Sequence, residues 1–252
     1  MELGLEIVLF LVLCAFVAGF VDAIAGGGAL ITIPVLLSVG IPPIQALGTN
    51  KMQSTFGSFS AALYFFKHNK ISLKEMRGSI IAVFIFGAFG AILVQYINAK
   101  VLSSLIPFLL IAFAFYFLFS PKMSDSESKR VLGNFGMMVM AGIVGFYDGF
   151  FGPGTGSFFA LIFIALGGYG VTRATANAKL LNFTSNLASL LFFALGGEVL
   201  VMLGILMGIG QYFGAQLGSK AALKHGSKLI KPLMVTVSLA ISCKLLWQQY
   251  LA

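Results

Sequence analysis

Charged side chains are scarce in this sequence, and their scarcity decides its broad class. Asp, Glu, Lys and Arg make up 10% of the 252 residues, whereas apolar types make up 59% and the mean hydropathy is +0.99. Soluble globular proteins carry about 25% charged residues. This composition excludes an ordinary soluble domain and indicates an integral membrane protein.

Cysteine is nearly absent as well. Cys14 and Cys243 both fall inside apolar runs, where buried thiols behave as small hydrophobic groups. Two such residues predict neither a disulfide framework nor a metal site. We therefore expect no metal, and we assign no cofactor and no catalytic residue to this chain.

A basic stripe interleaved with aromatic residues, which would indicate nucleic-acid binding, is also missing despite the net charge of +8. Most of the basic residues instead lie in three segments, as expected of cytoplasmic loops under the positive-inside rule. These residues are Lys67, Lys70, Lys74 and Arg77, then Lys122, Lys129 and Arg130, then Lys220, Lys224, Lys228 and Lys231. We predict a lipid bilayer around the protein and no nucleic-acid partner.

Long uncharged stretches take up much of the chain. Residues 78–99 and 101–121 contain no charged side chain, and each stretch is long enough to cross a hydrocarbon core of about 30 Å. Neither alternates between apolar and polar residues, which argues against a β-barrel. We predict an all-α polytopic membrane protein with about eight full transmembrane helices, near residues 5–25, 44–66, 78–97, 101–119, 132–151, from after 170 to 195, 199–218 and 229–250. The apolar runs at 29–39 and 157–166 are shorter and predict broken or re-entrant helices.

The second half of the chain repeats the plan of the first. The stretch GFVDAIAGGGALITIPVLLSVGIPPIQALGTNK, residues 19–51, returns as GFYDGFFGPGTGSFFALIFIALGGYGVTRATANAK, residues 145–179. Each copy has an aspartate before a glycine cluster, a short apolar run, and a lysine among polar residues at the start of a longer helix. This repetition predicts a first transmembrane repeat at 1–120, a hydrophilic linker at 121–131 and a second repeat at 132–252.

The relative direction of the two halves depends on the short apolar runs. If the basic loops at 120–131 and 219–231 lie on one side of the membrane, the run at 157–166 must count as a crossing, and the second half is then inverted. If the short runs are re-entrant, the halves are parallel and the last basic loop lies outside, against the positive-inside rule. We favour the inverted repeat and keep the parallel arrangement as the alternative.

The repeated stretch also carries the chemistry. An Asp or Lys near the middle of a membrane helix costs at least about 2.5 kcal/mol, so such residues persist where they face water, a partner or a substrate. A helix N-terminus with free amide groups attracts anions, and two facing half-sites would form one site for a small anion. We predict coupling roles for Asp22 and Asp148, and a substrate-binding role for Gly26, Gly27, Gly28, Thr49, Asn50, Lys51, Gln53, Gly152, Gly154, Thr155, Asn177, Lys179 and Asn182.

Simpler roles are open for each of these residues. Glycines in membrane helices are often packing contacts. Lys51 and Lys179 could lie near the interface and extend their amines to water, and Arg173 could be an interfacial anchor. Asp22 and Asp148 could serve only to neutralise the lysines.

Four segments carry a resemblance to a known family. GFVDAIAGGGALITIPVLL, ALGTNKMQSTFGSFSA, GFYDGFFGPGTGSFF and ATANAKLLNFTSNLASL resemble the paired signatures of the sulfite exporter TauE/SafE family of bacterial inner-membrane permeases, over nearly the whole chain. The resemblance implies a multi-pass protein of the bacterial inner membrane that moves sulfur-containing anions such as sulfite or an organosulfonate. We predict a secondary transporter with proton or membrane-potential coupling; a monomer and a homodimer both fit the sequence.

Three other functions use the same features. A passive anion channel could share every residue of the predicted site. An intramembrane aspartyl protease would use the pair Tyr147 and Asp148, but the GxGD motif is missing because residues 19–21 before Asp22 read Gly-Phe-Val. A structural membrane subunit would give no reason for repeated charges inside the membrane. The sequence therefore favours a transporter over an enzyme.

Overall fold

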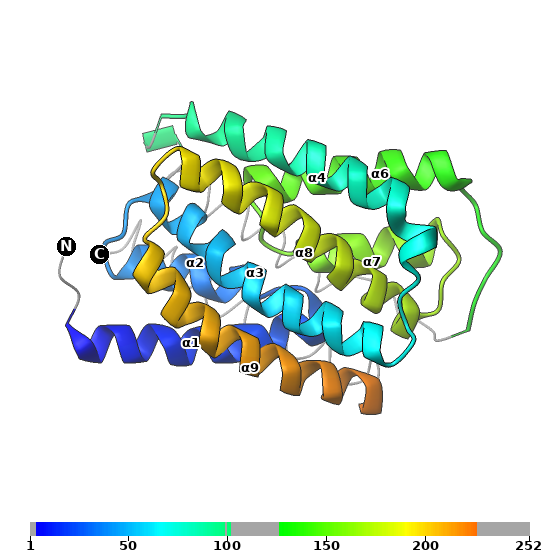
Figure 1. The fold of residues 1–252 in the computed structure, drawn as a ribbon, viewed down its shortest axis with the longest axis horizontal. Coiled ribbons are helices and arrows are strands. Elements are labelled where there is room, and N and C mark those ends of the chain that lie inside the picture. Colours follow the sequence, from blue (N-terminus) through cyan, green and yellow to red (C-terminus); the bar gives the residue numbers. More distant parts are fainter. Residues whose placement is uncertain (1–3, 99, 102–125, 226–252) are drawn as a thin grey trace, which may run out of the picture.

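Every element of regular secondary structure in the described part of the protein is a helix. A computed structural model describes residues 4–98, 100–101 and 126–225 (Figure 1). Its helices are α1 Leu5–Ala25, α2 Ala29–Ser38, α3 Pro43–Lys67, α4 Leu73–Gln95, α6 Asn134–Phe150, α7 Thr155–Ala165, α8 Val171–Leu195 and α9 Val201–His225. The helices predicted at 101–119 and 229–250 lie outside the described residues, apart from position 101.

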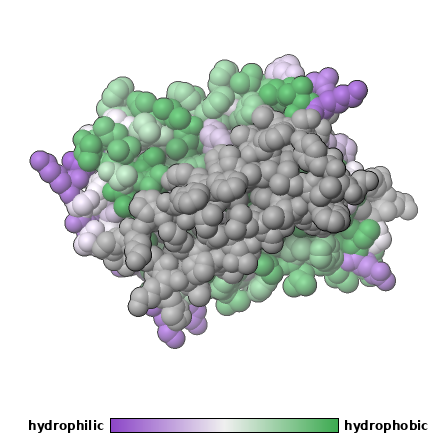
Figure 2. Space-filling view, turned by 180° about the vertical axis from the view of Figure 1, so that it is seen from behind, coloured by the Kyte–Doolittle hydropathy of each residue, from purple (hydrophilic) through white to green (hydrophobic). Residues whose placement is uncertain are grey.

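Length and composition make four of these helices able to cross a membrane, namely α1, α4, α8 and α9, while α2 and α7 are shorter apolar helices. Figure 2 shows hydrophobic residues over the flanks of the molecule and hydrophilic residues toward the two ends of its long axis. The prediction of an all-helical membrane protein is confirmed to this extent.

Two helices reach further than their apolar sequence predicts. Helix α4 begins at Leu73 rather than at 78, and α9 continues to His225 rather than ending at 218. Lys74, Arg77, Lys220 and Lys224 therefore lie on helices and not in loops. Lysine and arginine are good helix formers, so a helix does not end where it leaves the apolar region. At α4, the Ser72 hydroxyl also accepts a hydrogen bond from the Glu75 amide at 3.5 Å and caps the first turn.

Equivalent helices of the two halves run in opposite directions. In Figure 1, α1 and α3 begin at the left end of the molecule, whereas α6 and α8 begin at the right end. Helix α4 runs from right to left and α9 from left to right. The end of α3, the start of α4, the start of α6 and the end of α9 consequently lie at the same end. We call it the basic end, because the described basic residues of all three segments gather there.

The first helix of each half packs against the last described helix of the other half. Helix α1 packs along α9, and α6 packs along α4. Glycines at one-turn intervals bring α9 close to α1. A Cβ on Gly210 would lie 2.6 Å from the Val12 carbonyl oxygen. Cβ atoms on Gly214 and Gly218 would overlap the carbonyl oxygens of Phe16 and Phe20. Small residues permit this close helix packing in membranes.

The linker between the halves is attached to the turn between α7 and α8 at the basic end. The Ser128 amide donates to the Gly168 carbonyl at 2.9 Å, and the Val131 amide donates to Leu166 at 3.0 Å. Arg173, in the first turn of α8, forms ion pairs with Glu75 of α4 at 2.8 Å and Glu127 of the linker at 3.3 Å. Arg173 therefore connects three segments at this end of the molecule.

Candidate functional site

The glycine breaks of the two halves meet inside the molecule. Gly26 ends α1 in the left-handed conformation at φ 76°, which favours glycine, and Gly152 follows α6 at φ 102°. A Cβ on Gly156 would lie 2.6 Å from the Gly26 Cα, so two backbones touch here. The Ser157 hydroxyl also donates to the Ala25 carbonyl. The two glycine segments are therefore in direct contact where the two halves meet.

The repeated lysines and aspartates form two ion pairs that cross between the halves. The Lys51 Nζ lies 3.1 Å from the Asp148 Oδ1, and the Lys179 Nζ lies 3.0 Å from the Asp22 Oδ2. Each amine also donates to the backbone carbonyl of the same aspartate. Both lysines are 1% exposed, so they do not extend to the interface. Each half thus supplies the countercharge of the other.

The two aspartates have different surroundings. Asp148 accepts a hydrogen bond from the Ser185 hydroxyl at 2.5 Å, and its side chain is 2% exposed. Asp22 accepts one from the Gly28 amide at 3.1 Å, and its side chain is 12% exposed. Of the two carboxylates, Asp22 is therefore the more accessible to water.

A small polar cavity lies between the halves beside these pairs. Its volume is about 10 Å³, which is room for about one water molecule. The lining combines six residues of the predicted site with four others. The predicted ones are Asp22, Gly26, Asn50, Asp148, Gly152 and Asn182, and the four others are Ala29, Ser54, Gly156 and Asn186.

The sequence could have indicated three of the four missed residues. Ser54 follows Lys51 by three positions, and Asn186 follows Lys179 by seven. Residues at these intervals share one face of a helix. Gly156 completes the second glycine cluster, whereas Ala29 carries no chemical signal of its own.

The other predicted site residues do not line the cavity. The Gln53 amide donates to the Asn50 Oδ1 at 3.0 Å, so it contacts a lining residue and not the cavity itself. The Thr49 hydroxyl accepts the Leu200 amide at 3.0 Å and serves the start of α9. The Asn177 amide is buried without a hydrogen-bond partner among the described residues. The lining also does not include Gly27, Gly28, Gly154, Thr155 or the lysines of the two ion pairs.

The N-terminus of α2 is not the open anion site that the glycine cluster suggested. The Gly28 amide, at the start of α2, already donates a hydrogen bond to the Asp22 carboxylate. A carboxylate at this position balances the positive end of the helix. An incoming anion would therefore have to replace a carboxylate that belongs to the protein.

Gln211 of α9 is a buried polar residue that the sequence analysis missed. Its side chain is packed against α3, where a Cβ on Gly57 would lie 2.6 Å from the Gln211 Cγ. Gln211 is 1% exposed, and its Oε1 atom has no hydrogen-bond partner in the described part of the chain. A glutamine near the middle of a largely apolar helix is the signal that could have identified it.

The position equivalent to Gln211 in the other half is Val83, because Gly145 packs against Val83 as Gly19 packs against Gln211. Ser185 in turn holds the position equivalent to Gly57. The Gln211 amide in one half therefore takes the place of the Ser185 side chain in the other. The two halves therefore differ by the exchange of an amide for a hydroxyl at this place.

These features suit the transient binding of a small anion. Two amines, two carboxylates and several amide and hydroxyl groups converge where both halves meet, with the charges balanced in the closed state. Within the described ranges, no three His, Cys, Asp or Glu residues are grouped to hold a metal ion.

The family model and two bacterial relatives point to the same kind of membrane protein. The family model described as Sulfite exporter TauE/SafE matches residues 11–245. The probable membrane transporter protein YfcA of Escherichia coli is 47% identical over 244 residues, covering 96% of this chain and 90% of that protein. A probable membrane transporter protein of Haemophilus influenzae is 44% identical over 251 residues, covering 99% and 98%. No solved structure matches the chain significantly.

Proposed function

This chain belongs to the sulfite exporter TauE/SafE family, and we propose that it is a secondary transporter of a small anion, sulfur-containing such as sulfite or an organosulfonate. The family and the names of the relatives indicate a membrane transporter rather than an enzyme. Since relatives occur in Escherichia coli and Haemophilus influenzae, we place the protein in the bacterial inner membrane as a multi-pass permease.

The crossed ion pairs carry this proposal. A buried lysine keeps its charge only when a negative group lies beside it. Asp148 and Asp22 fill that role in the closed state, and the substrate anion would fill it during transport. The residues that change partner are therefore Lys51 and Lys179, while Asn50, Ser54, Asn182 and Asn186 would donate hydrogen bonds to the anion.

The small size of the cavity supports a closed intermediate. A volume of about 10 Å³ holds about one water molecule and no sulfite or sulfonate group. The anion would enter when one ion pair separates and the glycine segments move apart. Gly26 and Gly156 are in direct contact, so the two halves leave no passage at this point.

Proton coupling follows from the release of an aspartate. When an anion takes over a lysine, the freed carboxylate lies in a desolvated place without its countercharge, so binding a proton becomes favourable. Anion binding and proton binding then favour each other reciprocally. We assign this role to Asp22 and Asp148, whose charge would also couple transport to the membrane potential.

We further propose that the halves are inverted repeats that move against each other. The opposite directions of α1 and α6 and of α3 and α8, and the exchanged contacts of α9 with α1 and of α4 with α6, support this arrangement. Inverted repeats with a site at their interface are typical of carriers that alternate between two open states.

Binding and flux measurements test the function. Sulfite, thiosulfate, sulfate, taurine and acetate would be screened for thermal stabilisation of the purified protein, and the best anion would be followed in proteoliposomes. A carrier gives saturable flux and accelerated exchange when unlabelled anion is present on the far side. A passive channel, the second candidate, gives flux that rises linearly and shows no such exchange. Stabilisation by no anion would contradict the proposal.

A further inference from the structure

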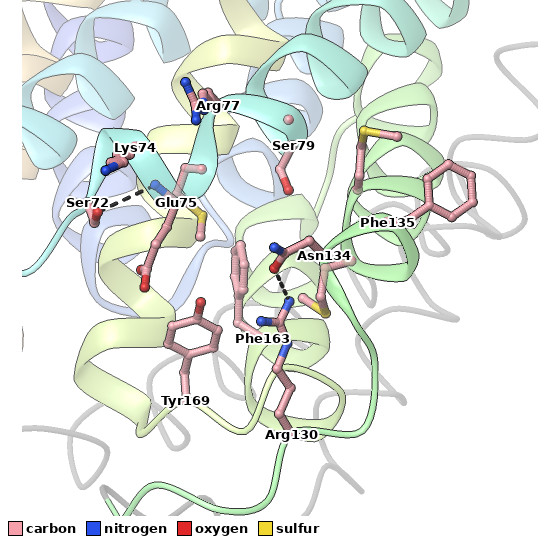
Figure 3. Close-up of a pocket in the computed structure, with 14 residues that line it drawn as sticks. Ser72, Lys74, Glu75, Arg77, Ser79, Arg130, Asn134, Phe135, Phe163 and Tyr169 are labelled. Atoms are coloured by element: carbon pink, nitrogen blue, oxygen red, sulfur yellow. Dashed lines mark hydrogen bonds between the residues drawn. The ribbon is translucent and has the colours of Figure 1, made fainter.

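A second pocket lies at the basic end, apart from the central cavity. Its volume is about 600 Å³, and it opens between the first turns of α4 and α6, beside the linker and the turn between α7 and α8. Figure 3 shows Lys74 and Arg77 on the α4 side, with Arg130 and Asn134 on the opposite side. None of its residues lines the central cavity. Its chemistry is therefore independent of the proposed transport site.

The rim of this pocket carries a surplus of positive charge. Arg130 donates to the Leu132 carbonyl at 2.6 Å and to the Asn134 side chain at 2.7 Å, which holds its guanidinium in place. No carboxylate of a described residue lies within ion-pair distance of Lys74, Arg77 or Arg130. Glu75, the acidic residue of the lining, is already paired with Arg173. Within the described part of the chain, the three cations therefore have no carboxylate to balance them.

The remaining polar groups of the pocket are neutral. Ser72 and Ser79 supply hydroxyl groups, and Tyr169 supplies a phenol whose hydroxyl points toward Glu75 in Figure 3. Burial, together with the Glu75 carboxylate, raises the pKa of Tyr169, so its hydroxyl stays protonated at neutral pH. These groups can donate hydrogen bonds to an anion without adding charge.

The floor of the pocket is apolar. Met76, Met137 and Phe163 line it and are at most 4% exposed. Beyond the pocket, the outer faces of α4 and α6 expose apolar side chains one helical turn apart: Ile81 and Ile85 on α4 are 60% and 59% exposed, and Val139 and Ile143 on α6 are 43% and 53% exposed. The pocket is thus cationic at its rim and continues into an apolar surface, which suits an amphiphile with an anionic head.

We propose that this pocket binds the headgroup of an anionic phospholipid from the surrounding leaflet, with its acyl chains along the exposed apolar stripe of α4 and α6. Under the positive-inside rule the basic end faces the cytoplasm, where anionic lipids attract clustered basic residues. Arginine matches the geometry of a phosphate oxygen pair, so Arg77 and Arg130 hold the phosphate from opposite sides. The bound lipid joins α4, α6 and the linker between the halves.

Lipid titration with matched variants tests this site. Purified protein in phosphatidylcholine nanodiscs would receive increasing phosphatidylglycerol, with lipid retention counted by native mass spectrometry and stability followed by thermal unfolding. The double variant Arg77→Gln/Arg130→Gln removes two pocket cations. Lys67→Gln/Lys70→Gln removes two exposed cations of the same end that do not line the pocket, and so controls for net charge.

We expect the pocket variant to lose affinity for phosphatidylglycerol by about tenfold or more, while the control variant keeps the affinity of the unmodified protein. If Arg77→Gln/Arg130→Gln unfolds in phosphatidylcholine, Lys74→Gln/Arg77→Gln replaces it, because that pair leaves the contacts of Arg130 intact. An equal loss in pocket and control variants would overturn the proposal in favour of diffuse surface attraction. Stabilisation by inorganic phosphate alone, to the level reached with phosphatidylglycerol, would overturn it in favour of a soluble anion.

Discussion

Lys51 forms its ion pair with Asp148, 97 positions away in the other half of the chain, and not with Asp22 of its own half. The same exchange pairs Lys179 with Asp22. Each half therefore contains an unbalanced charge that only the other half neutralises. The crossed ion pairs therefore hold the two halves to each other, and the following predictions rest on them.

The first prediction concerns partner specificity. Lys51→Met should destabilise the protein by about 3–5 kcal/mol, because it leaves a buried carboxylate without a countercharge. Adding Asp148→Asn should recover most of that loss, whereas adding Asp22→Asn should not, because Asp22 pairs with Lys179. Thermal unfolding in detergent measures the three variants. Equal recovery by both aspartate changes would exclude the crossed pairing.

The second prediction concerns substrate binding. The charge-neutral variants Lys51→Met/Asp148→Asn and Lys179→Met/Asp22→Asn should remain folded but lose stabilisation by the substrate anion, because each lacks one amine of the site. A matched control is Lys67→Met, which changes an exposed lysine of the basic end. Binding is measured by calorimetry or thermal shift. Unchanged affinity in both double variants would remove the lysines from the substrate site.

The third prediction separates the two aspartates. Asp148 accepts a hydrogen bond from the Ser185 hydroxyl and its side chain is 2% exposed, whereas the Asp22 side chain is 12% exposed. Asp22→Asn should therefore still exchange anions but no longer respond to an imposed pH gradient, and Ser185→Ala should make Asp148 able to take over part of the response. Flux in proteoliposomes measures both. A wild-type protein indifferent to pH would contradict proton coupling.

The fourth prediction concerns access to the site. In a background with both native cysteines replaced by alanine, Ala29→Cys should react with a water-soluble thiol reagent and be protected by substrate, because Ala29 lines the cavity. Thr155→Cys should react more slowly, since Thr155 is 1% exposed and its hydroxyl donates to the Gly152 carbonyl at 2.6 Å. Equal and substrate-independent labelling at both positions would contradict this geometry.

The fifth prediction concerns the contact between α1 and α9. Gly214→Ala should destabilise the protein by about 1–3 kcal/mol or more, because the added methyl group would overlap the Phe16 carbonyl. Gly133→Ala is the control, since nothing lies within 4 Å of the position that its Cβ would take. Thermal unfolding compares the two, and a neutral Gly214→Ala would mean that α1 and α9 are not in close contact.

Composition and internal repetition are enough to predict the class of the protein, its helices and the recurrence of its chemistry. Scarce charge and long uncharged stretches require helices, because a backbone in lipid must satisfy its own hydrogen bonds. The repeated Asp and Lys were visible because charges inside a membrane are expensive and rare. The predicted start of α4 at 78 and end of α9 at 218 are wrong, since these helices begin at Leu73 and end at His225. Helix propensity and capping, rather than hydropathy, decide where a helix begins and ends.

Which of these residues meet depends on how the helices pack. Nothing in the spacing of Asp22 and Lys51 reveals that each pairs across the halves, because partners in space are set by how α1 and α3 pack against α6 and α8. The same holds for Thr49, whose hydroxyl serves the start of α9, and for Gln211, whose packing against Gly57 depends on a helix about 150 positions away. Local sequence fixes the chemistry of a side chain and its place on a helix face, and the packing of helices fixes its partners.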